Sequence, residues 1–185
     1  MQEENNIWVE IKNGNKDYLS KIFLEYHDDL FLFAKRFEND EDEVKDLIQE
    51  LFFKLWKNRK SLNLNNNIKG YLFKSIRNLF NNKIIVDKRI IKENIRNEES
   101  FKYMQDDFSS NNDISESKKK KLISVLNEIP EKQREAIYLK YFQGFDIQEI
   151  SEILNINQQS VRNNLHRAMS KLREKMLLQT FLSLV

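Results

Sequence analysis

The side chains best suited to chemistry in this sequence form a polar cluster between positions 158 and 167. The cluster consists of Gln158, Gln159, Ser160, Arg162, Asn163, His166 and Arg167. Arginine can bridge two acceptors on guanine, and asparagine or glutamine can pair bidentately with adenine. The start of a helix is the part that enters the major groove. The cluster therefore predicts a surface that reads base edges of duplex DNA, and a solvated helix face is the alternative interpretation.

Three amphipathic helices between Pro130 and Lys175 must position this cluster. Asp146, followed three residues later by Glu149, predicts a capping box, and Asn157 predicts the cap of the third helix. The expected buried faces hold Ile137, Tyr138, Tyr141 and Phe142 in the first helix, Ile147, Ile150, Ile153 and Leu154 in the second, and Val161, Leu165, Ala168 and Leu172 in the third. A short helix, a tight turn and a capped long helix together predict a helix-turn-helix.

Basic residues continue along the third helix at Lys171, Arg173 and Lys175. They suit contacts with DNA phosphates, and they equally suit the negative end of a helix dipole. The sequence leaves both interpretations open for these three residues.

The composition limits the classes of function. Only three Gly and one Pro occur in 185 residues that are 40% hydrophobic, which favours long helices. The chain has no Cys and two isolated His, so we expect no disulfide, no metal site and no cofactor. No apolar run reaches membrane-spanning length, so we expect a cytoplasmic protein without direct membrane insertion. The net charge is only +2, and the distribution of charge must indicate the partners.

A helix is predicted from about Lys16 to Phe37, and a second long helix follows the acidic segment Glu38–Glu43. Beside the buried stripe of this second helix lies a polar stripe with one aromatic residue. It consists of Asp46, Gln49, Glu50 and Phe53. An exposed aromatic among hydrogen-bonding groups is typical of a protein-docking surface. Phe53 could equally pack at the edge of the core.

Basic residues dominate from Lys57 to Lys92, where Asp87 is the one acidic residue. An Asn-rich loop at 61–67 precedes a third predicted helix. One face of this helix carries Phe73, Lys74, Arg77, Asn78 and Asn81. Cations, amides and an aromatic suit single-stranded DNA, whose bases are free to stack and pair. A solvated basic face is the competing interpretation.

These patterns predict an all-α chain of two small helical domains joined by a flexible linker. We place the domains at residues 1–92 and 118–185 and the linker at 93–117, with a short helix around 101–104. The 25 residues of this linker could extend to ~80 Å. Four consecutive lysines at 118–121 are expected to start a solvated helix, and a phosphate-binding patch is the alternative interpretation.

Four sequence segments resemble a known family. They are EVKDLIQELFFKLW at 43–56, NIKGYLFKSIRN at 67–78, IPEKQRE at 129–135 and LHRAMSKLR at 165–173. In this order they resemble bacterial RNA polymerase sigma factors of the extracytoplasmic-function group, and the resemblance extends from about Lys16 to Lys175. Asn157 departs from it, because Ser or Thr often holds that cap in the family.

The resemblance implies a sigma factor whose partners are core RNA polymerase and promoter DNA, with an anti-sigma factor as a candidate third partner. Asp46, Gln49, Glu50 and Phe53 would then contact polymerase. Minus-10 DNA would be bound by Asn66, Lys69, Lys74, Arg77, Asn78 and Asn81. The cluster from Gln158 to Arg167 would read the minus-35 element. Elements one to two DNA turns apart imply a separation of ~34–70 Å, within reach of the linker.

Two other classes of function compete with this one. A regulator that binds duplex DNA without entering polymerase explains Pro130 to Lys175 equally well, but leaves the Asp46 to Phe53 stripe and the basic third helix unexplained. A hydrolase lacks support, because no motif joins a nucleophile to a base. We therefore expect no catalytic residues and no small-molecule substrate.

Overall fold

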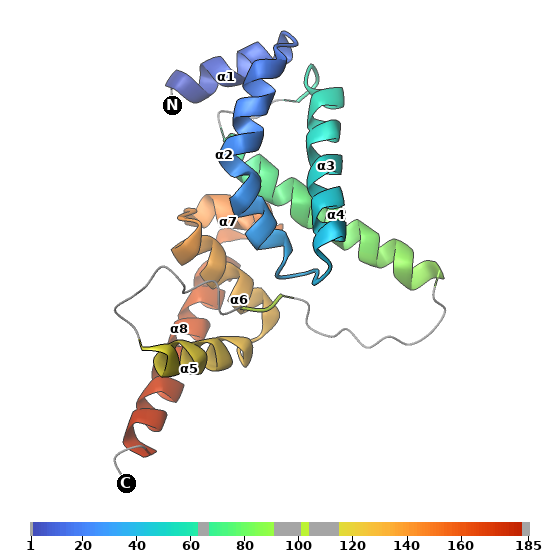
Figure 1. Ribbon diagram of the computed structural model, residues 1–185. Helices are drawn as coiled ribbons and strands as arrows, with labels where there is room; N and C mark the ends of the chain where they lie inside the picture. Colours follow the sequence, from blue (N-terminus) through green and yellow to red (C-terminus); the bar gives the residue numbers. More distant parts are fainter. Residues whose placement is uncertain (1, 63–66, 91–100, 104–114, 183–185) are drawn as a thin grey trace. The chain divides into compact units, whose positions relative to one another are not determined.

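The computed structural model describes residues 2–62, 67–90, 101–103 and 115–182, with side chains described for 7–62, 67–83, 101–103 and 115–176. The chain divides into two compact units, Met1–Arg96 and Asn97–Val185. All regular elements of the described residues are helices, which confirms the predicted fold class. Unit 1 holds α1 (Gln2–Lys12), α2 (Lys16–Ala34), α3 (Glu41–Asn58) and α4 (Ile68–Ile90) (Figure 1). Unit 2 holds α5 (Glu116–Asn127), α6 (Glu131–Ile137), the π-helix η2 (Tyr138–Phe142), α7 (Ile147–Leu154) and α8 (Gln158–Leu182).

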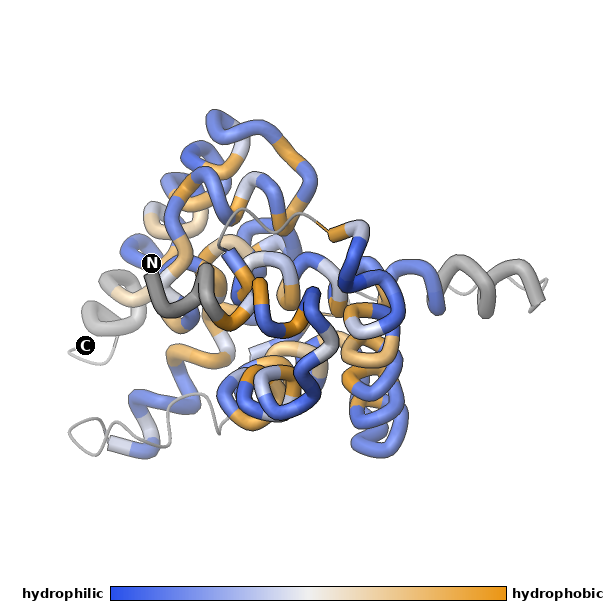
Figure 2. The backbone as a smooth tube through the Cα atoms, turned by 90° about the horizontal axis from the view of Figure 1, so that it is seen from above, coloured by the Kyte–Doolittle hydropathy of each residue, from blue (hydrophilic) through white to orange (hydrophobic). Residues whose placement is uncertain are grey.

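The core of unit 1 lies between α2, α3 and α4, which all pack on one another, and α1 packs on α2. Hydrophobic and hydrophilic segments follow one another along the helical turns of the chain, as Figure 2 shows. The buried residues include Trp8, Ile11, Leu30, Phe33, Leu51, Leu55 and Leu72. Each helix therefore contributes one apolar face, as its 3.6-residue period predicts.

Phe73 corrects one prediction from the sequence. It was expected on the polar face of α4, but it is fully buried, and its ring centroid lies 5.0 Å from that of Phe33. Both α2 and α3 pack on α4, so its apolar face is wider than a single stripe. Phe73 cannot serve as an exposed platform for a DNA base.

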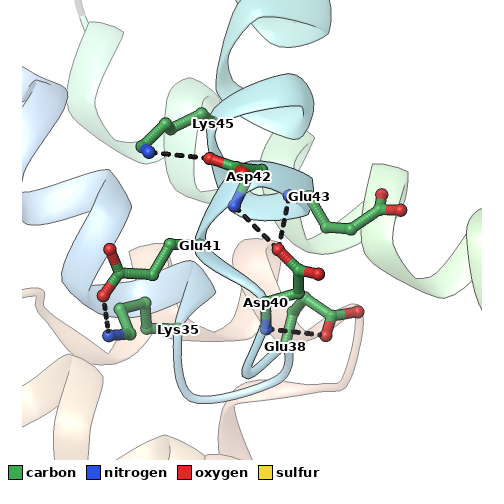
Figure 3. Close-up of polar contacts among 7 residues, drawn as sticks. All are labelled: Lys35, Glu38, Asp40, Glu41, Asp42, Glu43 and Lys45. Atoms are coloured by element: carbon green, nitrogen blue, oxygen red, sulfur yellow. Dashed lines mark hydrogen bonds and ion pairs between the residues drawn. The ribbon is translucent and has the colours of Figure 1, made fainter.

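The beginning of α3 is held by side-chain hydrogen bonds and ion pairs (Figure 3). The carboxylate of Asp40 accepts bonds from the backbone N–H groups of Asp42 and Glu43, at 2.9 and 3.4 Å. Lys83 of α4 forms ion pairs with Glu43 at 2.6 Å and Glu38 at 3.7 Å. These contacts fix where α3 begins and join α3 to α4, so they determine which side chains of α3 face outward.

Unit 2 is built on α8, against which α5, α6 and α7 pack. The predicted capping box of α7 is confirmed: Glu149 N–H donates to Asp146 at 2.8 Å, and Asp146 N–H donates to Glu149 at 2.7 Å. Asn155 ends α7 in the left-handed conformation, with φ of 54°. The Asn157 cap is also confirmed, because its side chain accepts the Ser160 N–H at 2.7 Å.

A π-helix at the end of α6 exposes two residues that were predicted to be buried. Tyr141 is 60% exposed and Phe142 is 37% exposed. Gln143 N–H donates to the carbonyl of Tyr138, five residues earlier, at 3.2 Å. Tyr141 and Phe142 both lie within the wider π turn, which moves their side chains away from the apolar stripe that an α-helix would continue.

The described part of the segment predicted to be a linker is ordered against unit 2. Phe101 and Tyr103 are buried, and residues 101–103 are not helical. The short helix predicted around 101–104 is therefore not formed by these three residues. The other positions of the predicted linker up to residue 114 lie outside the described residues.

We expect Asp146→Ala to destabilise α7 locally by ~1 kcal/mol, because the change removes the N-cap acceptor. Native-state hydrogen exchange should show amides in the first turn of α7 exchanging about fivefold faster. Asp146→Asn keeps an acceptor and should leave the exchange rates close to those of the parent chain. Equal acceleration in both variants would contradict the assigned role of the cap.

Candidate functional sites

The ridge of α3 is the first candidate site, defined as Asp46, Gln49, Glu50 and Phe53. All four side chains are exposed, and Phe53 is 66% exposed. The adjacent Phe52 is the one that enters the core. The structure therefore excludes the alternative in which Phe53 packs at the core edge. An exposed aromatic beside two carboxylates and an amide can supply both apolar contact and charge recognition to a protein partner.

Two hollows flank the ridge. One, of about 320 Å³, lies between α3 and α4 and is lined by Glu43, Asp46, Leu47, Glu50, Lys54, Leu79, Asn82 and Lys83. The other, of about 380 Å³, lies between α2 and α3 and is lined by Leu19, Ser20, Phe23, Leu24 and Phe52. The ridge residues Asp46 and Glu50 thus line a charged hollow, and the second hollow is mainly apolar.

The exposed apolar residues of α2 were missed from the sequence. Leu24 is 77% exposed, and the neighbouring Phe23 is half-buried. Leu24 lies outside the apolar stripe that the helical period defines, and that departure from the period was the available signal. With Phe23 it extends the apolar surface beside the ridge.

Electrostatics stabilise the helix that carries the ridge. The hydrogen bond from Lys35 lowers the pKa of Glu41, and the hydrogen bond from Lys45 lowers the pKa of Asp42 (Figure 3). Asp42 in turn raises the pKa of Lys45. Carboxylates with lowered pKa values stabilise the fold at neutral pH, and this contribution is lost as the pH falls through the folded-state pKa. Negative charge in the first turn also complements the helix dipole.

The second candidate site is the polar face of α4. Lys74 and Asn78 are exposed there, and Lys69, Arg77 and Asn81 are half-buried. These five residues share the helix, and Asn66 lies outside the described residues. With Phe73 buried, this face offers cations and amides rather than a stacking ring. It can bind phosphates and hydrogen-bond to bases.

Asn67 positions the beginning of α4, a role that was not predicted. Its side-chain oxygen accepts the Gly70 N–H at 2.7 Å. A Cβ atom at Gly70 would lie only 2.6 Å from Asn67 Nδ2 and 2.8 Å from its Oδ1. Gly70 therefore makes room for the cap. The Asn-x-x-Gly spacing at a helix start was the available signal.

The third candidate site is the start of α8. Every member of the cluster between Gln158 and Arg167 is exposed except Ser160, which is half-buried. Gln159 donates to Asn163 at 3.1 Å and Arg162 donates to Gln158 at 3.4 Å. The cluster is thus directed away from the core of its own unit. Its hydrogen-bonding groups are held on a capped helix start, the geometry that base reading requires.

Two of the basic residues farther along α8 make contacts within unit 2. Lys171 Nζ donates to the carbonyl oxygen of Glu128 at 2.9 Å, and Lys175 forms an ion pair with the Glu128 carboxylate. These contacts join α8 to the residue that follows α5. Lys171 and Lys175 are therefore engaged in stabilising the unit, whereas Arg173 is exposed.

No group of three or more potential metal ligands occurs among the described residues. Within the described helices, none is long and apolar enough to cross a membrane.

Two family models match the chain. Sigma-70 region 2 matches residues 22–89, and sigma-70 region 4 matches residues 119–172. The first match contains the α3 ridge and the α4 face. The second contains α7, the turn that follows it, and α8 as far as Leu172.

Curated relatives and solved structures agree with these matches. ECF RNA polymerase sigma factor SigW of Bacillus subtilis (strain 168) is 26% identical over 178 residues, covering 90% of this chain and 93% of the relative. SigM of the same organism is also 26% identical, over 155 residues, with coverages of 84% and 93%. The structure of CnrH with the cytosolic domain of CnrY aligns at TM-score 0.64 and 18% identity, covering 96% and 97% of the two chains. RpoE of Bartonella quintana, with the anti-sigma factor NepR, aligns at TM-score 0.61 and 22% identity, covering 87% and 97%.

We expect Gly70→Ala to destabilise unit 1 by ~1 kcal/mol, because the new Cβ displaces the Asn67 cap. In an Asn67→Ala background the same change should be neutral or stabilising, since alanine is the better helix former. Both tryptophans, Trp8 and Trp56, lie in unit 1, so tryptophan fluorescence during urea unfolding measures its stability. If Gly70→Ala lowered the free energy of unfolding equally in the parent chain and in the Asn67→Ala background, displacement of the Asn67 cap would not be the cause of the destabilisation.

Proposed function

Because the chain belongs to the extracytoplasmic-function group of the sigma-70 family of RNA polymerase sigma factors, we propose that its three candidate sites divide the work of promoter recognition. The chain directs promoter-specific transcription initiation with RNA polymerase. Every step is recognition by non-covalent contacts, so none requires a catalytic residue.

The α3 ridge is the proposed polymerase-binding surface. Its support is the exposure of Phe53 together with Asp46, Gln49 and Glu50. Burying an exposed aromatic residue supplies affinity, and charged groups around it supply orientation and specificity. Lys54 forms an ion pair with Glu50 at 2.6 Å. Polymerase would compete for this carboxylate.

The α4 face is the proposed binding surface for the minus-10 element. Lys74 and Asn78 are exposed there, and the Asn67 cap fixes the beginning of the helix. Cations attract the backbone of an opened strand, and amides can hydrogen-bond to its exposed base edges. Phe73 takes no part, since it is buried. Strand capture here would rest on charge and amide pairing.

The start of α8 is the proposed reader of the minus-35 element. The single observation that supports it most strongly is the exposure of Arg162, Asn163 and Arg167 beside a capped helix start. These side chains match the acceptor and donor patterns of the major groove. A regulator that binds duplex DNA alone would need only this surface. The match of residues 22–89 to sigma-70 region 2 disfavours that alternative.

An anti-sigma factor is a proposed further partner. The solved structures similar to this chain include CnrH with the cytosolic domain of CnrY and RpoE with the anti-sigma factor NepR. The proposed place of action is the cytoplasm, where polymerase and DNA are found.

We expect Gln49→Ala combined with Glu50→Ala to weaken binding to core polymerase at least ~10-fold, because two groups of the ridge are removed. A pull-down with purified core enzyme measures the effect. The matched control is Gln148→Ala with Glu152→Ala, which removes one amide and one carboxylate from α7. Undiminished binding by the ridge variant would refute the assignment of this surface. Run-off transcription by the unmodified chain with core enzyme tests the function as a whole.

We expect Arg162→Ala to weaken DNA binding by ~1–3 kcal/mol on the matched minus-35 element. The loss should be much smaller on DNA in which the one base pair contacted by Arg162 is already changed. Arg173→Ala removes an exposed cation farther along α8 and should weaken binding similarly for all sequences. Fluorescence anisotropy can compare a promoter mapped by transcript sequencing with its single-base variants. If Arg162→Ala reduced the affinity equally for matched and mismatched DNA, Arg162 would be excluded as a base reader.

A further inference from the structure

Residues 101–103 are held on unit 2 through their backbone. The side-chain amide of Asn127 pairs with Tyr103 twice, accepting its N–H at 2.8 Å and donating to its carbonyl oxygen at 3.1 Å. The N–H of Phe101 donates to the carboxylate of Glu131 at 3.1 Å. Asn127 therefore satisfies both backbone polar groups of Tyr103, as a neighbouring strand would.

The two aromatic rings of this segment add apolar contacts. The Phe101 ring lies 5.8 Å from that of Tyr138, and the Tyr103 ring lies 5.6 Å from that of Phe142. The Tyr103 hydroxyl also donates to the carbonyl oxygen of Arg134 at 3.1 Å. Phe101 is fully buried, and Tyr103 is 3% exposed. These contacts come from α6 and η2, in addition to Asn127 at the end of α5, so the segment contacts three elements of unit 2.

The attachment shortens the chain that connects the two units. Phe101 lies 11 positions after Ile90, the end of α4, whereas Ser115, the cap of α5, lies 25 positions after it. At ~3.3 Å per residue, the shorter path can extend to ~36 Å, and the longer one to ~80 Å. Promoter elements one to two DNA turns apart lie ~34–70 Å from each other.

We propose that Phe101 and Tyr103 form an anchor that ends the tether between the units at residue 101 and thereby limits the spacing of promoter elements that both units can bind together. The dependence on promoter spacing rests on the function proposed above. A tether that cannot span two sites gives almost no effective concentration for the second binding event. The residues between the anchor and α5 add nothing to the reach while the anchor holds.

Two insertions of the same composition test the anchor. A Gly/Ser segment of about sixteen residues is placed after Asn97 in one variant and after Ser109 in the other. The chain has no Cys, so dyes attached at Glu25→Cys in unit 1 and Ser170→Cys in unit 2 report the distance between the units. Both labelled positions are exposed. Single-molecule energy transfer is measured on the full chain.

The insertion after Asn97 should increase the mean distance between the dyes by ~10 Å, because it lengthens the tether itself. The insertion after Ser109 should leave the distance unchanged, since it lies beyond the anchor. Adding Tyr103→Ala and Asn127→Ala to the second insertion should produce an increase, because the anchor is then released. Equal responses to the two insertions in the parent background would overturn the proposal.

The consequence for promoters is measured by run-off transcription on templates whose spacers are lengthened in single base pairs. The insertion after Asn97 should extend the range of active spacers, and the insertion after Ser109 should not. Identical spacer ranges would overturn the link to promoter spacing. Failure of the unmodified chain to initiate on the parent template would instead count against the proposed function, and the distance measurement on the free chain would still decide whether the anchor exists.

Discussion

The positions at which the helices begin are the constraint on which the rest of this structure depends. The chain has three Gly and one Pro, so short polar side chains rather than breakers define many of these positions. Asp40, Asn67, Asp146 and Asn157 each accept a backbone N–H of the first turn. A helix that began one residue later would turn its outward side chains by about 100° relative to the chain entering it. The caps therefore decide which residues meet a partner.

Packing then separates buried from available side chains. The apolar faces of α2, α3 and α4 close on one another and leave the ridge of α3 outside. In unit 2, α8 carries the core on one face and the polar cluster between Gln158 and Arg167 on the other, and Glu128 contacts its far half through Lys171 and Lys175. The same helix thus packs into the core with one face and presents the proposed DNA-reading residues with the other, because its two faces are chemically distinct.

Charged side chains also fall into two groups, those that form ion pairs within the fold and those that are exposed to solvent. Around the beginning of α3, carboxylates are paired with Lys35, Lys45 and Lys83, which stabilises the helix that presents the ridge. At the start of α8, Arg162 and Arg167 are exposed. Cations directed to solvent can exchange their hydration for phosphate and base contacts, whereas paired cations would first have to release a partner. At the start of α8 this cost is therefore smaller than it is for the paired lysines around the beginning of α3.

The sequence by itself determined the helical class, the capping box of α7, the Asn157 cap and the outward position of the polar cluster between Gln158 and Arg167. These features depend on residues within four positions of one another, so the local period and local hydrogen bonds are sufficient to predict them. Only the tertiary structure decided that Phe73 is buried, that η2 exposes Tyr141, and that Lys171 binds a residue 43 positions away. It also placed Tyr103 on Asn127 and Arg134, 24 and 31 positions along the chain. Such contacts arise when separate elements pack, and no periodic pattern in the sequence encodes them.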